Sequence, residues 1–302
     1  MALEPQYVDY FNDDEELVSK VGVSDIEIIR GWLTKQPHLP RISDKQLVIF
    51  LNYCQNNLEK TKKMIDSYYT TRTHSADLFA NKTMKELEQT FDTYYFHKLP
   101  TLPNGCRVGF SRLRDMDPSH FNTLNTIRLL LGLYDMSVNE DPLAPEWRFV
   151  IDMTGFSMGH LTKLMDLKLM RKCIAYVQFV QPIQLIGIHM INAPSLASQL
   201  LIFLKPLMHK DMYSRISVFS SSEMKNFYKI VPQENLSSDL GGKSPSLEQL
   251  KETTFETLKK YEKWFEFDDK FGRVDETKRT EKYQYKSDDY GLEGSFKKLE
   301  FD

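Results

Sequence analysis

The segment from Gly155 to Gly159 reads G-F-S-M-G and is the most specific catalytic pattern in the sequence. A G-x-S-x-G motif between a strand and a helix is typical of a hydrolase nucleophile elbow, and the acid and the histidine of its triad must follow the serine in that order. Asp166 is the single acid between Ser157 and the last histidine, His209. It lies in the helix predicted to follow Ser157, about 13 Å along the axis, where it cannot orient a histidine beside the serine.

The simpler interpretation of this motif is structural. Gly155 permits a tight turn, and Ser157 caps a helix predicted over Gly159–Val180. We therefore expect the protein not to be an enzyme, and a serine hydrolase that uses Ser157 is the less favoured alternative.

Patterns for a metal, a nucleotide or another cofactor are missing from the sequence. The seven histidines are scattered, and no H-x-x-x-H or C-x-x-C pair occurs. Gly241-Gly242-Lys243-Ser244 lacks the upstream glycine and the preceding strand of a phosphate-binding loop. We expect no metal and no cofactor.

The composition is that of an ordinary globular protein. A chain of 302 residues with 41% hydrophobic content can bury a full core, and a formal net charge of −3 argues against a general nucleic-acid binder. Cys54, Cys106 and Cys173 form no disulfide or zinc pattern, and the acidic run Asp13–Glu16 is the opposite of a secretory signal. We expect a cytoplasmic protein, since no apolar run approaches the roughly 20 residues that span a bilayer.

Two short apolar segments, Trp147–Met153 and Gln184–Ile191, predict buried strands, and the helix between them predicts that they run parallel. Arg107–Leu113 and Ile216–Phe219 are further strand candidates. The predicted helices around these strands are Phe121–Met136, Gly159–Val180, Ser195–Met208 and Ser222–Tyr228. This order predicts an α/β fold with a parallel or mixed sheet.

The two ends of the chain have different patterns. Residues 15–96 are predicted to form a small helical bundle, with a cap at Ser43-Asp44 and a fourth helix over Met84–Tyr95. One amphipathic helix is predicted over Ser246–Phe267, followed by a charged tail from Asp268 that wraps the surface or is loosely ordered. The predicted domains are residues 1–95, 96–245 and 246–302.

Apolar side chains around the predicted sheet indicate a lipophilic pocket. They are Trp147, Phe149 and Ile151 on alternate strand positions, with Tyr176, Val180, Ile188 and Met190. The segment Ser195–Met208 is apolar on nearly every side. Its residues Leu196, Leu200, Phe203 and Leu207 can face the sheet, which leaves Leu201, Ile202 and Leu204 partly outward. Such a patch is typical of a membrane or ligand contact, and the segment is predicted to be a lid.

Several of these segments resemble the CRAL-TRIO lipid-transfer family, in particular its tocopherol and retinaldehyde carriers and their invertebrate relatives. The resemblance covers about residues 21–250. It is carried by Val150–Gly155, Ile188–Pro194, Leu204–Leu207 with Arg215-Ile216, Leu47–Leu51, Leu58–Lys62, Val231–Glu234 and Gly241-Gly242. The strand-turn motif and the Asn-x-Pro motif are specific together.

The resemblance implies an α/β fold in which an N-terminal helical bundle is followed by a CRAL-TRIO α/β/α lipid-binding domain with a mobile gate helix. By position, the gate is Ser195–Met208. The ligand-binding residues indicated by the apolar pattern and the resemblance are Trp147, Phe149, Ile151, Met158, Tyr176, Val177, Val180, Ile188, Met190, Leu200, Phe203, Leu204 and Leu207. The residues of the gate and its membrane contact are Leu196, Leu201, Ile202, Lys205, Lys210 and Arg215. One or two polar groups usually orient such a ligand, and the candidates are Ser157, Tyr176, Gln178 and His189.

The basic patch with which tocopherol carriers bind phosphoinositide headgroups is largely missing here. The corresponding positions are Asn52, Cys54, Ile186 and Asp211, and Arg215 alone is still basic. Because phosphate recognition relies on Arg or Lys donors, this departure puts phosphoinositide binding in doubt.

We therefore predict a cytosolic carrier that binds one hydrophobic small molecule in a gated cavity and transfers it between membranes. The expected ligand is a tocopherol, a retinoid, a carotenoid or a related isoprenoid. The other expected partner is a membrane surface, contacted transiently, and no nucleic acid is expected. Phosphatidylinositol or phospholipid transfer and a lipid-sensing scaffold are the alternatives among binding proteins.

Overall fold

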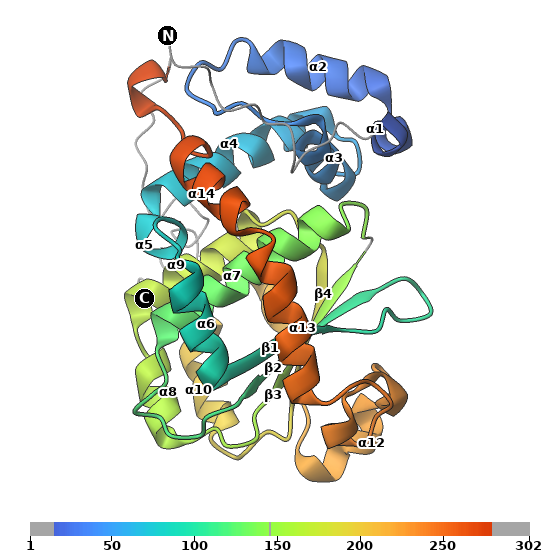
Figure 1. The fold of residues 1–302 in the computed structure, drawn as a ribbon, viewed down its shortest axis with the longest axis vertical. Helices are drawn as coiled ribbons and strands as arrows, with labels where there is room; N and C mark the ends of the chain where they lie inside the picture. Colours follow the sequence, from blue (N-terminus) through green and yellow to red (C-terminus); the bar gives the residue numbers. More distant parts are fainter. Residues whose placement is uncertain (1–14, 145, 280–302) are drawn as a thin grey trace, which may run out of the picture.

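The computed structural model describes residues 15–144 and 146–279 (Figure 1). The first helices are α1 (Glu15–Val21), α2 (Val23–Leu33), α3 (Asp44–Tyr53), α4 (Leu58–His74), α5 (Ala76–Phe79) and α6 (Met84–Thr93). Three of them begin at a side-chain cap, because Ser43, Asn57 and Thr83 each accept a hydrogen bond from the backbone N–H three residues later. The predicted N-terminal helical region is confirmed.

Five strands form one mixed sheet in the order β1-β2-β3-β4-β5. They are β1 (Tyr94–Leu99), β2 (Arg107–Leu113), β3 (Trp147–Asp152), β4 (Leu185–Ile191) and β5 (Ile216–Val218). β1 is antiparallel to β2, and the other neighbours are parallel, as predicted for β3 and β4. The register places Phe149 of β3 beside Gly109 of β2 and Ile188 of β4.

The remaining helices cover the two faces and one edge of this sheet. They are α7 (Thr123–Glu140), α8 (Met158–Leu164), α9 (Leu167–Phe179), α10 (Ala197–Leu204), α11 (Lys210–Ser214), α12 (Met224–Phe227), α13 (Leu247–Lys259) and α14 (Glu262–Phe271). Short 3₁₀ turns lie at η1 (Lys205–Leu207), η2 (Ser221–Glu223), η3 (Gln233–Asn235), η4 (Ser238–Leu240) and η5 (Glu276–Lys278). Figure 1 shows α13 along the β1 side of the sheet, and α14 continuing from it toward α4.

Strand alternation divides the core between the two faces of the sheet. Trp147 and Phe149 pack with α7, α9 and the N-terminal helices in one continuous cluster. Val150 and Ile191, whose side chains point to the opposite face, pack with Phe227 of α12. A third, smaller cluster lies under α10 and contains Met190. The face with Phe149 therefore combines the large core with the cluster under α10.

The structure corrects the sequence predictions at three element boundaries. Residues Tyr94–Phe96, predicted to be helical, belong to β1, because they pair with β2 from Ser111 to Leu113. The predicted helix Gly159–Val180 is two helices, α8 and α9, and the second begins at a new cap, Asp166. The predicted helix Ser246–Phe267 is likewise divided, into α13 and α14, at Lys260-Tyr261.

The prediction for the chain after Phe267 is wrong for its first residues. Asp268 lies in α14, is only 8% exposed and accepts a hydrogen bond from Arg72 of α4. The last part of the predicted tail, residues 280–302, lies outside the described residues. Among the residues that the structure describes, no helix is both long enough and apolar enough to cross a bilayer.

Candidate ligand cavity and gate

An apolar cavity of about 310 Å³ lies between the sheet, α7 and α13. Its floor is formed by β1, β2 and β3, including Trp147 and Phe149. Gly109 lies next to Phe149, and a Cβ at this position would come within 2.8 Å of the Phe149 ring. The ring can therefore lie flat on β2 only because residue 109 has no side chain. Known small-molecule pockets span about 300–1,000 Å³, so this cavity is at the lower end of that range.

One face of α7 forms the wall of the cavity. Leu130, Leu133, Tyr134 and Ser137 follow one another at helical spacing and all line it. The ring of Tyr134 lies 6.0 Å from that of Phe149, centroid to centroid. Burial raises the pKa of the Tyr134 phenol well above its ordinary value, so this side chain is a neutral hydrogen-bonding group.

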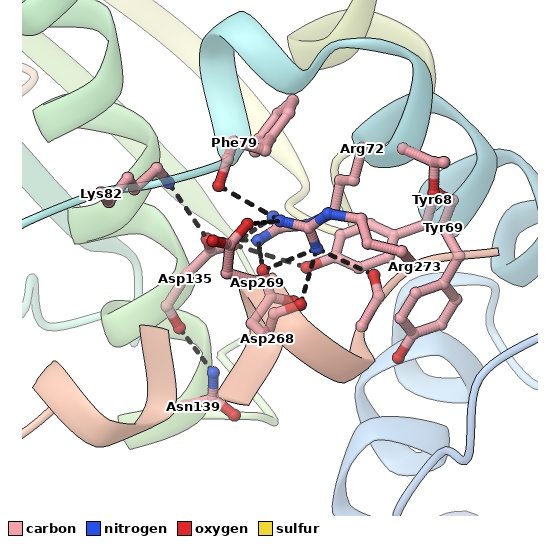
Figure 2. Close-up of polar contacts among 12 residues, drawn as sticks. Tyr68, Tyr69, Arg72, Phe79, Lys82, Asp135, Asn139, Asp268, Asp269 and Arg273 are labelled. Atoms are coloured by element: carbon pink, nitrogen blue, oxygen red, sulfur yellow. Dashed lines mark hydrogen bonds and ion pairs between the residues drawn. The ribbon is translucent and has the colours of Figure 1, made fainter. Parts of the chain in front are cut away.

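A buried network of charges holds α7 in place (Figure 2). The guanidinium of Arg72, on α4, donates to Asp135 of α7 and to Asp268 of α14, over 3.0 and 2.8 Å. It also donates to the hydroxyl of Tyr176 on α9, over 3.2 Å. Burial alone would raise the pKa of Asp268, but Arg72 and Arg273 outweigh that effect and hold the pKa below its ordinary value. Four helices distant in sequence are therefore joined behind the cavity wall.

The predicted gate is the segment α10 with η1. Ala197 and Leu200 are buried against Met190 of β4, and Leu201 and Leu204 are half-buried against the same cluster. Ile202 is 73% exposed, as expected for the outward side of the gate. The end of the gate is tied to α9, because Gln178 accepts from the backbone N–H of His209 at 2.7 Å and donates to the carbonyl of Leu207 at 3.2 Å.

Comparison with known proteins identifies the family. Residues 18–89 match the family model described as Pinta-like, UBA domain, and residues 103–242 match the CRAL/TRIO domain. The chain belongs to the CRAL/TRIO family of lipid-binding and lipid-transfer proteins. The resemblance seen in the sequence is confirmed.

Curated relatives extend this match over most of the CRAL/TRIO chain. Alpha-tocopherol transfer protein-like of Mus musculus is 22% identical over 256 residues, which cover 81% of this chain and 74% of the mouse protein. Clavesin-2 of Rattus norvegicus is 21% identical over 227 residues, covering 73% of this chain and 69% of the rat protein. A solved structure, the crystal structure of Sfh5, matches with a TM-score of 0.46 and 12% identity, over 80% of this chain and 92% of that one.

The CRAL/TRIO structure divides the predicted ligand-binding residues into separate groups. Trp147 and Phe149 line the cavity. Ile151, Met190, Leu200 and Leu204 pack in the cluster under the gate, and Ile188 and Val180 belong to the large core. Phe203 is half-buried, and Leu207 is buried. Val177 lines a different cavity, described below. No residue of α10 is among the described residues that line the apolar cavity.

Five of the sequence predictions for this site are wrong. Met158 is 53% exposed, because it begins α8 at the surface. Each proposed orienting group already has a partner elsewhere: Tyr176 bonds Arg72, Gln178 bonds the end of the gate, and His189 lies on the opposite face, where its Nε2 accepts from Arg148 at 3.2 Å. Ser157, the fifth, lies 2.8 Å from His160 Nδ1.

The Ser157–His160 contact is that of a helix cap. His160 Nδ1 also accepts from the backbone N–H of Ser157, at 3.2 Å, so the ring proton is on Nε2. This Nε2 is buried without a hydrogen-bond partner among the described residues, and burial lowers the pKa of His160. Asp166 is engaged as the cap of α9. The capping role predicted for Ser157, with a turn at Gly155 (φ 81°), agrees with this geometry.

A second, polar cavity of about 670 Å³ lies between the N-terminal helices and α9, α11 and β4. It contains Cys54, Asp211 and Arg215, three of the positions that correspond to a phosphoinositide site. Lys60 and Lys63 of α4 also line it, although the sequence gave no reason to place them there. Of the predicted membrane contacts, Lys205 and Lys210 are exposed.

Proposed function

We propose that this protein binds one hydrophobic small molecule in the cavity between the sheet, α7 and α13, and transfers it between membranes. The apolar cavity is the observation that carries this proposal, because the floor side chains Trp147 and Phe149 offer aromatic surface to a ligand. Transfer of apolar area out of water supplies about 25 cal/mol per Å². A tocopherol, a retinoid, a carotenoid or a related isoprenoid is the proposed ligand class, and no covalent step is involved.

The gate supports the transfer part of the proposal. Its inner side is apolar and packed against Met190, and its outer side presents Ile202 to solvent. A helix with apolar groups on both sides can exchange its buried contacts for contacts with a bilayer. Because the cavity has the smallest volume typical of a ligand pocket, a larger molecule requires the cluster under α10 to move apart.

Phospholipid transfer is the second candidate, favoured by the polar cavity. Lys60, Lys63 and Arg215 bring three cationic side chains to its lining, and such groups recognise phosphate. In that case the headgroup would bind between α4 and α11.

Native mass spectrometry of the full chain, after exposure to a total lipid extract, tests these candidates. Solvent extraction and identification of the bound molecule follow. A stoichiometric neutral isoprenoid supports the carrier, and a bound phospholipid that is lost in a Lys60→Glu/Lys63→Glu variant supports the second candidate. Failure of the folded protein to retain any lipid would contradict both.

A further inference from the structure

Two hydroxyl groups on the α7 wall make no hydrogen bond to any described residue. Ser137 is 4% exposed and Tyr134 is 9% exposed, and both line the apolar cavity. A buried hydroxyl normally has a partner, because leaving it without one costs about 1–3 kcal/mol. The wall of the cavity therefore holds hydrogen-bonding capacity that the protein itself does not use.

The opposite wall supplies acceptors. Thr253, Thr254 and Thr257 of α13 line the same cavity. Each hydroxyl donates its proton to the backbone carbonyl four residues earlier in α13. The lone pairs of these oxygens remain able to accept a hydrogen bond. A molecule between α7 and α13 thus meets hydroxyls that can donate on one side and acceptors on the other.

The charged side chains of the lining neutralise each other. Lys98 of β1 forms an ion pair with Glu140 at the end of α7, and both are partly exposed. The only histidine of the lining, His97, has a pKa lowered by burial to about 4, so it is neutral at pH 7. Among the described residues, the apolar cavity therefore presents no unpaired cation to an anionic headgroup.

From this arrangement we infer that the α7–α13 cavity binds the oxygen-bearing end of a neutral amphiphile, such as an isoprenoid alcohol. Ser137 and Tyr134 bond the oxygen from α7, and a ligand hydroxyl donates to a threonine of α13. The inference rests on the proposed carrier function and adds the class of ligand and the location of its polar end. That end lies away from α10, on the side of the cavity where Lys98 and Glu140 meet.

Binding of farnesol, of its hydrocarbon counterpart farnesene and of farnesyl phosphate to the delipidated full chain tests this inference. Displacement of bound Nile red gives the three dissociation constants. We expect farnesol to bind about 10-fold more tightly than farnesene, since the hydrocarbon leaves the hydroxyls unsatisfied. Ser137→Ala should weaken farnesol binding about 5- to 10-fold and leave farnesene binding unchanged. Farnesyl phosphate should bind no more tightly than farnesol.

Ser198→Ala is the matched control, because Ser198 is exposed on α10 and should leave all three constants unchanged. Equal binding of farnesol and farnesene that Ser137→Ala does not alter would overturn the inference while leaving the carrier function intact. Tighter binding of farnesyl phosphate would overturn the neutral ligand class. Absence of all binding, together with no retained lipid from the extract, would instead contradict the proposed function itself.

Discussion

Arg72 and Asp135 form a two-bond ion pair in the protein interior, with Nη1–Oδ1 and Nη2–Oδ2 distances of 3.0 Å each. Their side chains are 1% and 7% exposed. Asp268 adds a third bond from α14, so a single guanidinium joins the N-terminal helices, the cavity wall and the C-terminal helix. Planar, bidentate pairing of this kind is specific to arginine.

Arg72→Met should destabilise the protein strongly, because it leaves two buried carboxylates without their shared partner. We expect the free energy of unfolding to fall by about 3–5 kcal/mol, as measured by urea denaturation. The control is Lys259→Met, which removes an exposed pair with Glu256 and should cost less than about 1 kcal/mol. A loss in Arg72→Met no larger than in this control would show that the network contributes little to stability.

His97 should make the protein less stable in mild acid. It is 5% exposed, neither ring nitrogen has a partner among the described residues, and burial lowers its pKa to about 4. The unfolded chain, with a histidine pKa near 6.5, takes up the proton first as the pH falls. The stability that the neutral ring contributes is therefore complete above pH 6.5 and is lost as the pH falls from 6.5 through 4.

His97→Phe removes this titration and keeps a ring beside Phe110. The stability difference between the wild type and the variant should change in favour of the variant between pH 6.5 and 4, when urea unfolding is measured at several pH values. His189, whose pKa is also lowered by burial to about 4, keeps a similar dependence in both proteins and cancels in the difference. A difference that is constant across this range would exclude the assignment to His97.

The parallel β3–β4 core was predictable because a strand buried on both faces requires a continuous apolar run, and Trp147–Met153 and Gln184–Ile191 have one. β1 was not predictable. Tyr94–Leu99 follows α6 without a glycine or proline, and its strand conformation depends on pairing with β2. The break at Lys260-Tyr261 likewise has no local signal, since the different packing of α13 and α14 is what divides them.

The site was predictable in part for the same reason. Trp147 and Phe149 follow from strand alternation, but the second wall comes from α13, a helix more than a hundred residues later whose position depends on tertiary packing. A signal for Ser137 does exist, because a lone serine interrupts the apolar stripe of Leu130, Leu133 and Tyr134 on α7. The partnership of Arg72 with Asp135 and Asp268 has no such signal in a single sequence.

Filling the cavity from β2 should reduce ligand capacity. In Gly109→Val the new side chain would collide with Phe149, whose ring must then move into the cavity. We expect a loss of stability of about 1–3 kcal/mol from overpacking and weaker binding of an apolar dye such as Nile red. Gly31→Ala is the control, because a Cβ at Gly31 meets nothing within 4 Å and the substitution favours the helix. Unchanged dye binding in Gly109→Val would place the dye in another cavity.

The exposed lysines at the end of the gate should promote delivery to anionic membranes. Each basic residue near an anionic surface contributes about 1 kcal/mol of attraction, so the double reversal Lys205→Glu/Lys210→Glu should weaken binding to phosphatidylserine vesicles by roughly 30-fold or more. Ligand transfer to these vesicles should slow in parallel, and transfer to neutral vesicles should change little. Raising the salt concentration should reduce the difference, since the attraction is screened.

Lys225→Glu/Lys229→Glu is the matched control, because it changes the net charge equally but lies at α12, on the opposite side of the sheet from α10. If the protein docks through the gate, this control should retain most of its transfer to anionic vesicles, with only the small loss that a change of net charge produces at long range. Equal losses in the two variants would mean that overall charge attracts the protein to the bilayer. Equal retention would show that Lys205 and Lys210 take no part in docking, and that delivery depends on apolar contacts such as that of Ile202.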